Sequence, residues 1–152
     1  MDTFIHIRSA KFPILRGEEE ELVNEGTYGK AVAQYLQARL QERGYQVPFY
    51  CCEDWGWWVE LKNAPFAFGV CIYSGPKQDR PTDFFCTDSI HGERKWSWSQ
   101  FRFLNTSPWV QKLHQDMVAI FLADPEIELV NARCKDPFAV DESSEPDAPC
   151  DD

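Results

Sequence analysis

The clearest pattern in the chain is the alternation of apolar and polar side chains over residues 57–62. A period of two is typical of a strand that buries one face. The expected inward set is Trp57, Val59 and Leu61, and the expected outward set is Trp58, Glu60 and Lys62. A turn at residues 63–65 and a second alternating run over residues 66–73 follow, so the two segments predict adjacent antiparallel strands.

Two other segments carry the three-to-four-residue apolar spacing of amphipathic helices. The first covers residues 28–43, with Thr27 as its expected N-cap and Gly44 at the position of a left-handed C-cap residue. The second begins with Ser107 as its cap and ends before Pro125. Each helix has one apolar face, which predicts that both pack on a common core.

The remaining strand patterns are short and are separated by turn residues. They lie at residues 3–8, 45–50, 83–90, 95–104 and 127–130, and the phase of the fourth slips near Gln100, which indicates a bulge or a bend. Strands that follow one another with hairpin-length connections favour antiparallel pairing. The sequence therefore predicts an α+β fold, a two-layer sandwich of five to six mainly antiparallel strands with two helices packed on one face.

Charge divides the 152-residue chain into two parts. Residues 136–152 hold seven acidic residues and no Lys or Arg, and are rich in Pro and Ser. Subtracting these seven negative charges from the formal net charge of −10 leaves −3 for residues 1–135. We expect a single folded domain over residues 1–135 and a disordered acidic tail over residues 136–152.

The charge of the body and the absence of long apolar runs bear on the partner and the compartment. A body without excess positive charge is not suited to bind nucleic acid or an anionic membrane surface. No apolar run approaches the ~18 residues of a membrane span, and the first residues lack the pattern of a secretory signal. These features predict a cytoplasmic protein with reduced cysteines.

The sequence shows no constellation of catalytic or metal-binding residues. The three histidines and six cysteines have no zinc-ligand spacing. Cys86 lies five residues before His91, which leaves a Cys–His nucleophile pair open, although buried apolar thiols are the simpler interpretation. Strand alternation explains Glu60-Leu61-Lys62 without a nuclease site. We therefore predict no catalytic residue, no metal site and no cofactor.

The most unusual segment is the aromatic and acidic run over residues 51–58. It suggests a binding platform in which Trp55 or Trp58 stacks on a partner and Glu53 or Asp54 contacts a basic group. The alternative is a turn that enters a strand, with Trp57 in the core and Trp58 covered by a loop. The four successive glutamates from Glu18 to Glu21 are expected to be solvated surface.

Two motifs carry a resemblance to a protein family. Residues 17–30 read GEEEELVNEGTYGK, and residues 53–57 read EDWGW. In these segments the chain resembles an uncharacterised family of small bacterial proteins, whose motifs here cover about a fifth of the chain. The resemblance implies a bacterial cytosolic protein and supplies no catalytic residue. The adjacent Cys51 and Cys52 and the acidic tail are not part of it.

Two functional hypotheses follow from these observations. The first is a non-enzymatic protein-interaction module, such as an adaptor, a chaperone or an immunity-type inhibitor, whose partner is another protein with basic groups. The second is a small ligand-binding domain or enzyme with a pocket between sheet and helices. That pocket would be lined by Trp55, Trp57 and Trp96, with Glu53, Asp54 or His91 as its polar groups.

Overall fold

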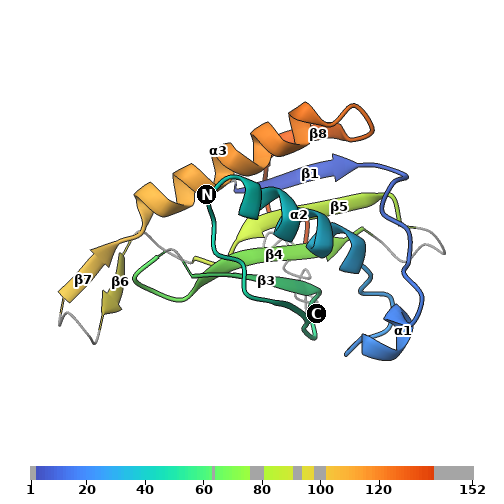
Figure 1. Cartoon of the computed structure of the whole chain (residues 1–152), viewed down its shortest axis with the longest axis horizontal. Helices are drawn as coiled ribbons and strands as arrows, with labels where there is room; N and C mark the ends of the chain where they lie inside the picture. Colours follow the sequence, from blue (N-terminus) through green and yellow to red (C-terminus); the bar gives the residue numbers. More distant parts are fainter. Residues whose placement is uncertain (1–2, 63, 76–80, 91–93, 98–101, 139–152) are drawn as a thin grey trace, which may run out of the picture.

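The computed structural model describes residues 3–62, 64–75, 81–90, 94–97 and 102–138 (Figure 1). The strands are β1 (Phe4–Arg8), β2 (Tyr50–Cys52), β3 (Trp57–Leu61), β4 (Phe68–Ser74), β5 (Asp83–Asp88), β6 (Arg94–Ser97), β7 (Arg102–Asn105) and β8 (Glu128–Cys134). The helices are α1 (Glu18–Glu21), α2 (Lys30–Glu42) and α3 (Ser107–Ala123).

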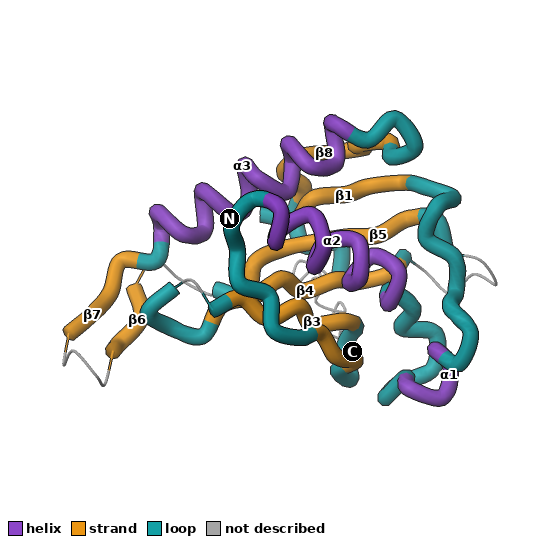
Figure 2. The backbone as a smooth tube through the Cα atoms, viewed as in Figure 1, coloured by secondary structure: helices purple, strands orange, loops and turns teal. Residues whose placement is uncertain are grey.

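Six strands form one antiparallel sheet in the order β2-β3-β4-β5-β1-β8. The two long helices, α2 and α3, lie on the same face of this sheet (Figure 2). The predicted α+β sandwich is confirmed. Because β1 lies between β5 and β8, the first strand of the chain connects the consecutive strands β2 to β5 with the closing strand β8.

The core lies between the sheet and the two helices. The predicted alternation in β3 is confirmed, because Trp57, Val59 and Leu61 are at most 2% exposed. The helices contribute one apolar face each to the same core. The buried residues of these faces are Val32, Ala33, Leu36, Leu40, Leu113, Met117, Ile120 and Phe121.

The helix boundaries differ from the prediction by one or two residues. Helix α2 begins at Lys30, and Thr27 does not cap it, because the Thr27 hydroxyl donates to the carbonyl of Asn24 at 2.8 Å. Gly44 is confirmed as the left-handed residue after α2, with φ of +93° and an N–H that donates to Gln41. In α3 the N-cap position is Thr106 rather than Ser107.

Three strand predictions need correction. The segment 45–50 is mostly not a strand, since Pro48 lacks an N–H for a sheet and β2 begins only at Tyr50. The closing strand predicted at 127–130 extends from Glu128 to Cys134. The single strand predicted over 95–104 is a separate hairpin of β6 and β7, and the slip near Gln100 lies outside the described residues.

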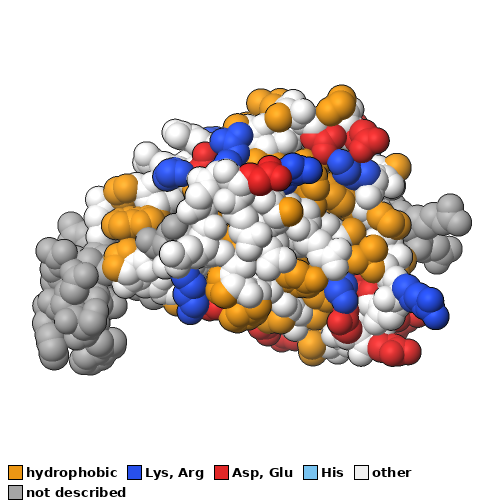
Figure 3. Space-filling view, in the orientation of Figure 1, with side chains coloured by type: hydrophobic (Ala, Val, Ile, Leu, Met, Phe, Trp, Pro, Cys, Tyr) orange, Lys and Arg blue, Asp and Glu red, His pale blue; other side chains and the backbone are white. Residues whose placement is uncertain are grey.

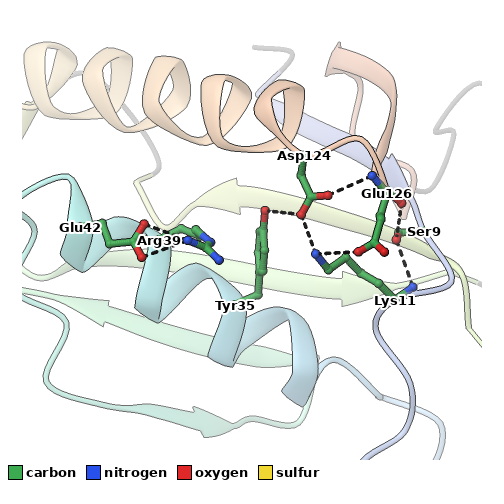
Figure 4. Close-up of polar contacts among 7 residues, drawn as sticks. All are labelled: Ser9, Lys11, Tyr35, Arg39, Glu42, Asp124 and Glu126. Carbon is green, nitrogen blue, oxygen red and sulfur yellow. Dashed lines mark hydrogen bonds and ion pairs between the residues drawn. The ribbon is translucent and has the colours of Figure 1, made fainter.

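A polar network joins the end of α3 to α2 and to the segment after β1 (Figure 4). Asp124 accepts hydrogen bonds from the Lys11 ammonium at 2.6 Å, the Tyr35 hydroxyl at 2.9 Å and the Glu126 backbone N–H at 2.9 Å. Ser9 completes the network by donating to the Glu126 carbonyl at 2.7 Å. The hydrogen bond from Lys11 is the main reason that the pKa of Asp124 lies below its ordinary value.

Basic and acidic side chains are intermixed on the face of the molecule that carries the helices (Figure 3). Several of them take part in ion pairs, such as Arg39 with Glu42 at 3.0 Å and Lys112 with Asp116 at 2.7 Å. In the parts of the chain that the structure describes, no helix is long and apolar enough to cross a membrane.

The first prediction concerns Asp124→Asn. At pH 7 this change should lower the free energy of unfolding by about 1–2 kcal/mol, because charge-assisted hydrogen bonds from Lys11 and Tyr35 weaken. A depressed carboxyl pKa stabilises the fold above the unfolded value of about 3.9, and this contribution is lost as the pH falls through the folded pKa. Urea unfolding of both proteins should therefore show a difference that shrinks below about pH 4.

The matched control is Glu42→Gln, which breaks the exposed ion pair with Arg39 on the same side of α2. Its effect on the free energy of unfolding should stay below about 0.5 kcal/mol. Equal urea midpoints for Asp124→Asn and wild type at pH 7 would show that the network does not hold α3 to α2.

Candidate functional site

The face of the sheet opposite α2 and α3 carries a group of aromatic side chains. They stand at the alternate positions of the strands whose other residues fill the core. We call this group the aromatic face, and it consists of Phe4, His6, Trp55, Trp58, Tyr73 and Phe85. All six side chains are partly exposed. The four central strands of the sheet each contribute at least one ring, and the turn between β2 and β3 contributes Trp55.

The rings of this face contact one another across the strands. Tyr73 is the centre, with Trp55 at 5.2 Å and Phe4 at 5.8 Å between ring centroids. Phe85 stacks on His6 at 4.4 Å and pairs with Tyr73 in the sheet register. Contacts at these distances are favourable ring pairs. The result is a continuous aromatic strip that runs across β4, β5 and β1.

Trp58 occupies its own part of the aromatic face, above Gly69 of the neighbouring strand. A Cβ added to Gly69 would lie 2.6 Å from Cζ2 of the Trp58 ring and 2.5 Å from the carbonyl oxygen of Val59. Because Gly69 has no side chain, the Trp58 indole can pack directly against the backbone at this position. Trp58 is therefore covered on its inner side by the chain itself, and its other side is partly exposed.

The turn between β2 and β3 places two acidic groups beside Trp55. The N–H of Glu53 donates to the Gly56 carbonyl at 2.7 Å and closes the turn. The side chains of Glu53 and Asp54 are exposed, whereas Trp55 is half-buried against Tyr73. This turn can offer a carboxylate and an indole to the same ligand.

A charged group borders the strip at the other end of β1 and β5. Asp83 hydrogen-bonds His6 at 2.7 Å and accepts from the Arg8 guanidinium at 3.0 Å. Burial alone would raise the pKa of Asp83, but the hydrogen bonds from His6 and Arg8 outweigh it and hold the pKa below its ordinary value. The hydrogen bond to Asp83 therefore fixes the orientation of the His6 ring, which stacks on Phe85.

The thiols near this face are poor nucleophiles. Burial raises the pKa of Cys71 to about 12, and burial together with Glu53 raises the pKa of Cys51. Cys86 is fully buried on the core side, and burial raises its pKa as well. His91, the partner considered for Cys86, lies outside the described residues. Among the described residues, no three His, Cys, Asp or Glu side chains gather closely enough to hold a metal ion.

The two motifs of the sequence resemblance meet in space. Asn24 donates its side-chain N–H to the Asp54 carbonyl at 2.5 Å, and the Trp57 indole N–H donates to the Thr27 carbonyl at 2.9 Å. Gly29 lies against Trp57, so that a Cβ at this position would be 3.0 Å from Cδ1 of the indole. These contacts fix the turn of residues 53–56 to the start of α2.

Glu18 is not solvated surface, which corrects the prediction for the four glutamates. Its side chain is 1% exposed, and its Oε1 accepts the backbone N–H groups of Lys30 at 2.8 Å and Gly29 at 3.4 Å. The carboxylate thus caps the first turn of α2 from a distant segment. Burial raises the pKa of Glu18 against the opposing effect of these hydrogen bonds, and its Oε2 has no hydrogen-bond partner among the described residues.

The four predicted site residues occupy two neighbouring places. Glu53, Asp54 and Trp55 share one turn, and Trp58 lies on the following strand above Gly69. Trp57 is on the core side, so it does not line a pocket with Trp55. The side chain of Trp96, the third aromatic residue proposed for that pocket, lies outside the described part of the structure.

Sequence reasoning missed Phe4, His6, Tyr73 and Phe85 as members of this site. The signal was present in the alternation, because residues 66–73 place Phe68, Val70 and Ile72 inward and hence Tyr73 outward. What the sequence could not supply was the strand order, which places β5 between β4 and β1.

Two grooves also occur on the helix side of the molecule. One, of about 410 Å³, lies between α2 and α3 and includes Arg39, Arg43 and Asp124. The other, of about 280 Å³, includes Tyr45, Trp109 and Lys112. Neither contains a predicted site residue, and the charged side chains that line them take part in ion pairs within the chain.

Comparison with known proteins gives no match, whether with family models, with curated proteins or with solved structures.

The second prediction concerns the buried carboxyl of Glu18. Because its folded pKa is raised above the unfolded value of about 4.3, ionisation of Glu18 destabilises the fold as the pH rises through the folded pKa. Glu18→Gln stays neutral and keeps an acceptor for the Lys30 N–H. From pH 4 to pH 7, chemical unfolding should therefore show Glu18→Gln gaining stability relative to wild type.

Glu18→Ala removes the cap altogether, and it should lower the free energy of unfolding by about 1–2 kcal/mol at pH 7. Glu20→Ala, on the exposed side of α1, should stay within about 0.5 kcal/mol of wild type. The assignment of Glu18 would be overturned by a Glu18→Gln variant that loses stability relative to wild type over the same pH range.

Proposed function

We propose that this chain is a non-enzymatic protein-interaction module of the bacterial cytosol, an adaptor, chaperone or immunity-type inhibitor. Its proposed binding site is the aromatic face together with the acidic turn, with Glu53, Asp54, Trp55 and Trp58 as the contact residues. The partner is another protein with basic groups.

One observation carries this proposal: six partly exposed rings form one side of a sheet whose other side is a closed core. A large exposed apolar patch on a small domain often marks an interaction site. Tyr and Trp are also the residues that most often dominate binding energy at protein interfaces. The face is therefore the part of the molecule best suited to a partner.

The acidic turn supports a basic partner. Glu53 and Asp54 are exposed and lie next to Trp55, so a lysine or arginine that contacts the turn can also lie against the indole ring. Charges at the rim of an interface act mainly on the association rate and on partner choice. The aromatic strip would then supply affinity, and the turn would supply selectivity.

The third prediction tests this function with affinity co-purification from the native cytosol, followed by mass spectrometry. Trp58→Ala and the double charge reversal Glu53→Lys with Asp54→Lys should each lower recovery of a stoichiometric partner at least tenfold. Trp58→Ala uncovers Gly69 and should also lower the melting temperature slightly, whereas the charge reversal changes exposed groups only and should leave it unchanged.

Two control variants change comparable groups on the helix side. Leu122→Ala removes a large apolar side chain that is 66% exposed on α3, and Glu42→Lys reverses an exposed charge on α2. Both should retain the partner. If all four variants recover it equally, or if only variants that melt early lose it, the aromatic face is not the binding site.

A further inference from the structure

The aromatic face already holds one ring from outside the sheet. Phe138 follows β8 by four residues, and its ring lies 5.2 Å from Tyr73 and 5.8 Å from Phe85 between centroids. The angle of 80° to Phe85 is an edge-to-face contact. Phe138 therefore contacts rings of both β4 and β5.

A local turn directs this ring onto the face. The Asp136 carboxylate accepts the backbone N–H of Phe138 at 2.8 Å, with Pro137 between them. An Asp side chain that bonds the N–H two residues on forms a compact turn without help from the rest of the fold. Asp136 also lies near enough to Tyr73 to contribute, after burial and Cys71, to the raised pKa of that hydroxyl, which is about 12.

The segment crosses the sheet from its edge rather than extending it. Cys134, the last residue of β8, pairs with Phe4 at the edge of the sheet, and four residues later the ring of Phe138 contacts the rings of Tyr73 on β4 and Phe85 on β5. Phe138 remains 50% exposed in this position, far more than the core phenylalanines Phe68 and Phe84 at 1%. The ring is thus seated on the face and is not part of the core.

We propose that Asp136-Pro137-Phe138 is a tethered ligand, which occupies in cis the site that a partner's aromatic residue takes when the partner binds. This inference rests on the proposed function and names the occupant of the same face. The partner feature that fits is a phenylalanine presented by a short turn, as the Asp136 carboxylate presents Phe138. The partner must displace the tethered ring, which competes at an effective concentration in the millimolar range.

The test uses the full-length chain and a synthetic peptide with the sequence of residues 135–140, Lys-Asp-Pro-Phe-Ala-Val. Phe138→Ala empties the position without shortening the protein. Titration is followed by NMR through the indole N–H signals of Trp55, beside Tyr73, and Trp109, which packs on Phe66 away from this face. The control peptide has Ala in place of Phe.

The expected result is saturable movement of the Trp55 signal in Phe138→Ala, with Trp109 unmoved. Wild type should bind the peptide at least tenfold more weakly, because its own ring competes. The control peptide should bind Phe138→Ala at least tenfold more weakly than the original. Asp136→Ala, which loosens the turn but keeps the ring, should give a peptide affinity between those of wild type and Phe138→Ala.

Three results would overturn the inference. The first is equal peptide affinity for wild type and Phe138→Ala, and the second is failure of Phe138→Ala to fold, which would make Phe138 a structural residue. The third is a wild-type dimer that becomes monomeric in Phe138→Ala, since the ring would then be exchanged between copies. If the peptide shows no binding to Phe138→Ala while Trp58→Ala still loses the co-purified partner, the proposed function stands. In that case only the assignment of Phe138 as a tethered ligand is wrong.

Discussion

The burial of Trp57 is the constraint on which most of this structure depends. Its indole is 2% exposed, so its N–H needs an acceptor inside the protein, and it finds the carbonyl of Thr27 just before α2. The indole also needs room, which Gly29 supplies by having no side chain. One side chain therefore sets both where α2 starts and how close it lies to the sheet.

The same constraint determines the opposite face. Successive side chains of a strand point to opposite sides, so a buried Trp57 sends Trp58 away from the helices. Gly69 on β4 then accepts the Trp58 ring, and the register that pairs Trp57 with Ile72 places Tyr73 next to the turn that holds Trp55. The aromatic face and the start of α2 are in this sense two consequences of one packed indole.

The sequence predicted what depends on local periodicity and missed what depends on contacts between distant segments. The strand at Trp57–Leu61, the α2 stripe and the left-handed Gly44 follow from spacing and from glycine chemistry, and the structure confirms them. The burial of Glu18 could not be predicted, because nothing in a run of four glutamates indicates which one lies beneath the first turn of α2. The aromatic strip could not be predicted from the sequence either, since it needs β1 to lie between β5 and β8.

The molecule separates the polar groups that hold the fold from the rings of the aromatic face. Asp124 with its partners and the Glu18 cap lie on the helix side or at the start of α2, and each accepts hydrogen bonds from other segments of the chain. On the aromatic face the side chains are only partly buried, and the ring that covers them comes from residues after the last strand of the sheet. Phe138 belongs to no helix or strand, so its ring can leave the face without disturbing either. The core can therefore stay intact while the face changes its occupant, which is the physical requirement for a surface that exchanges a tethered ring for a partner's.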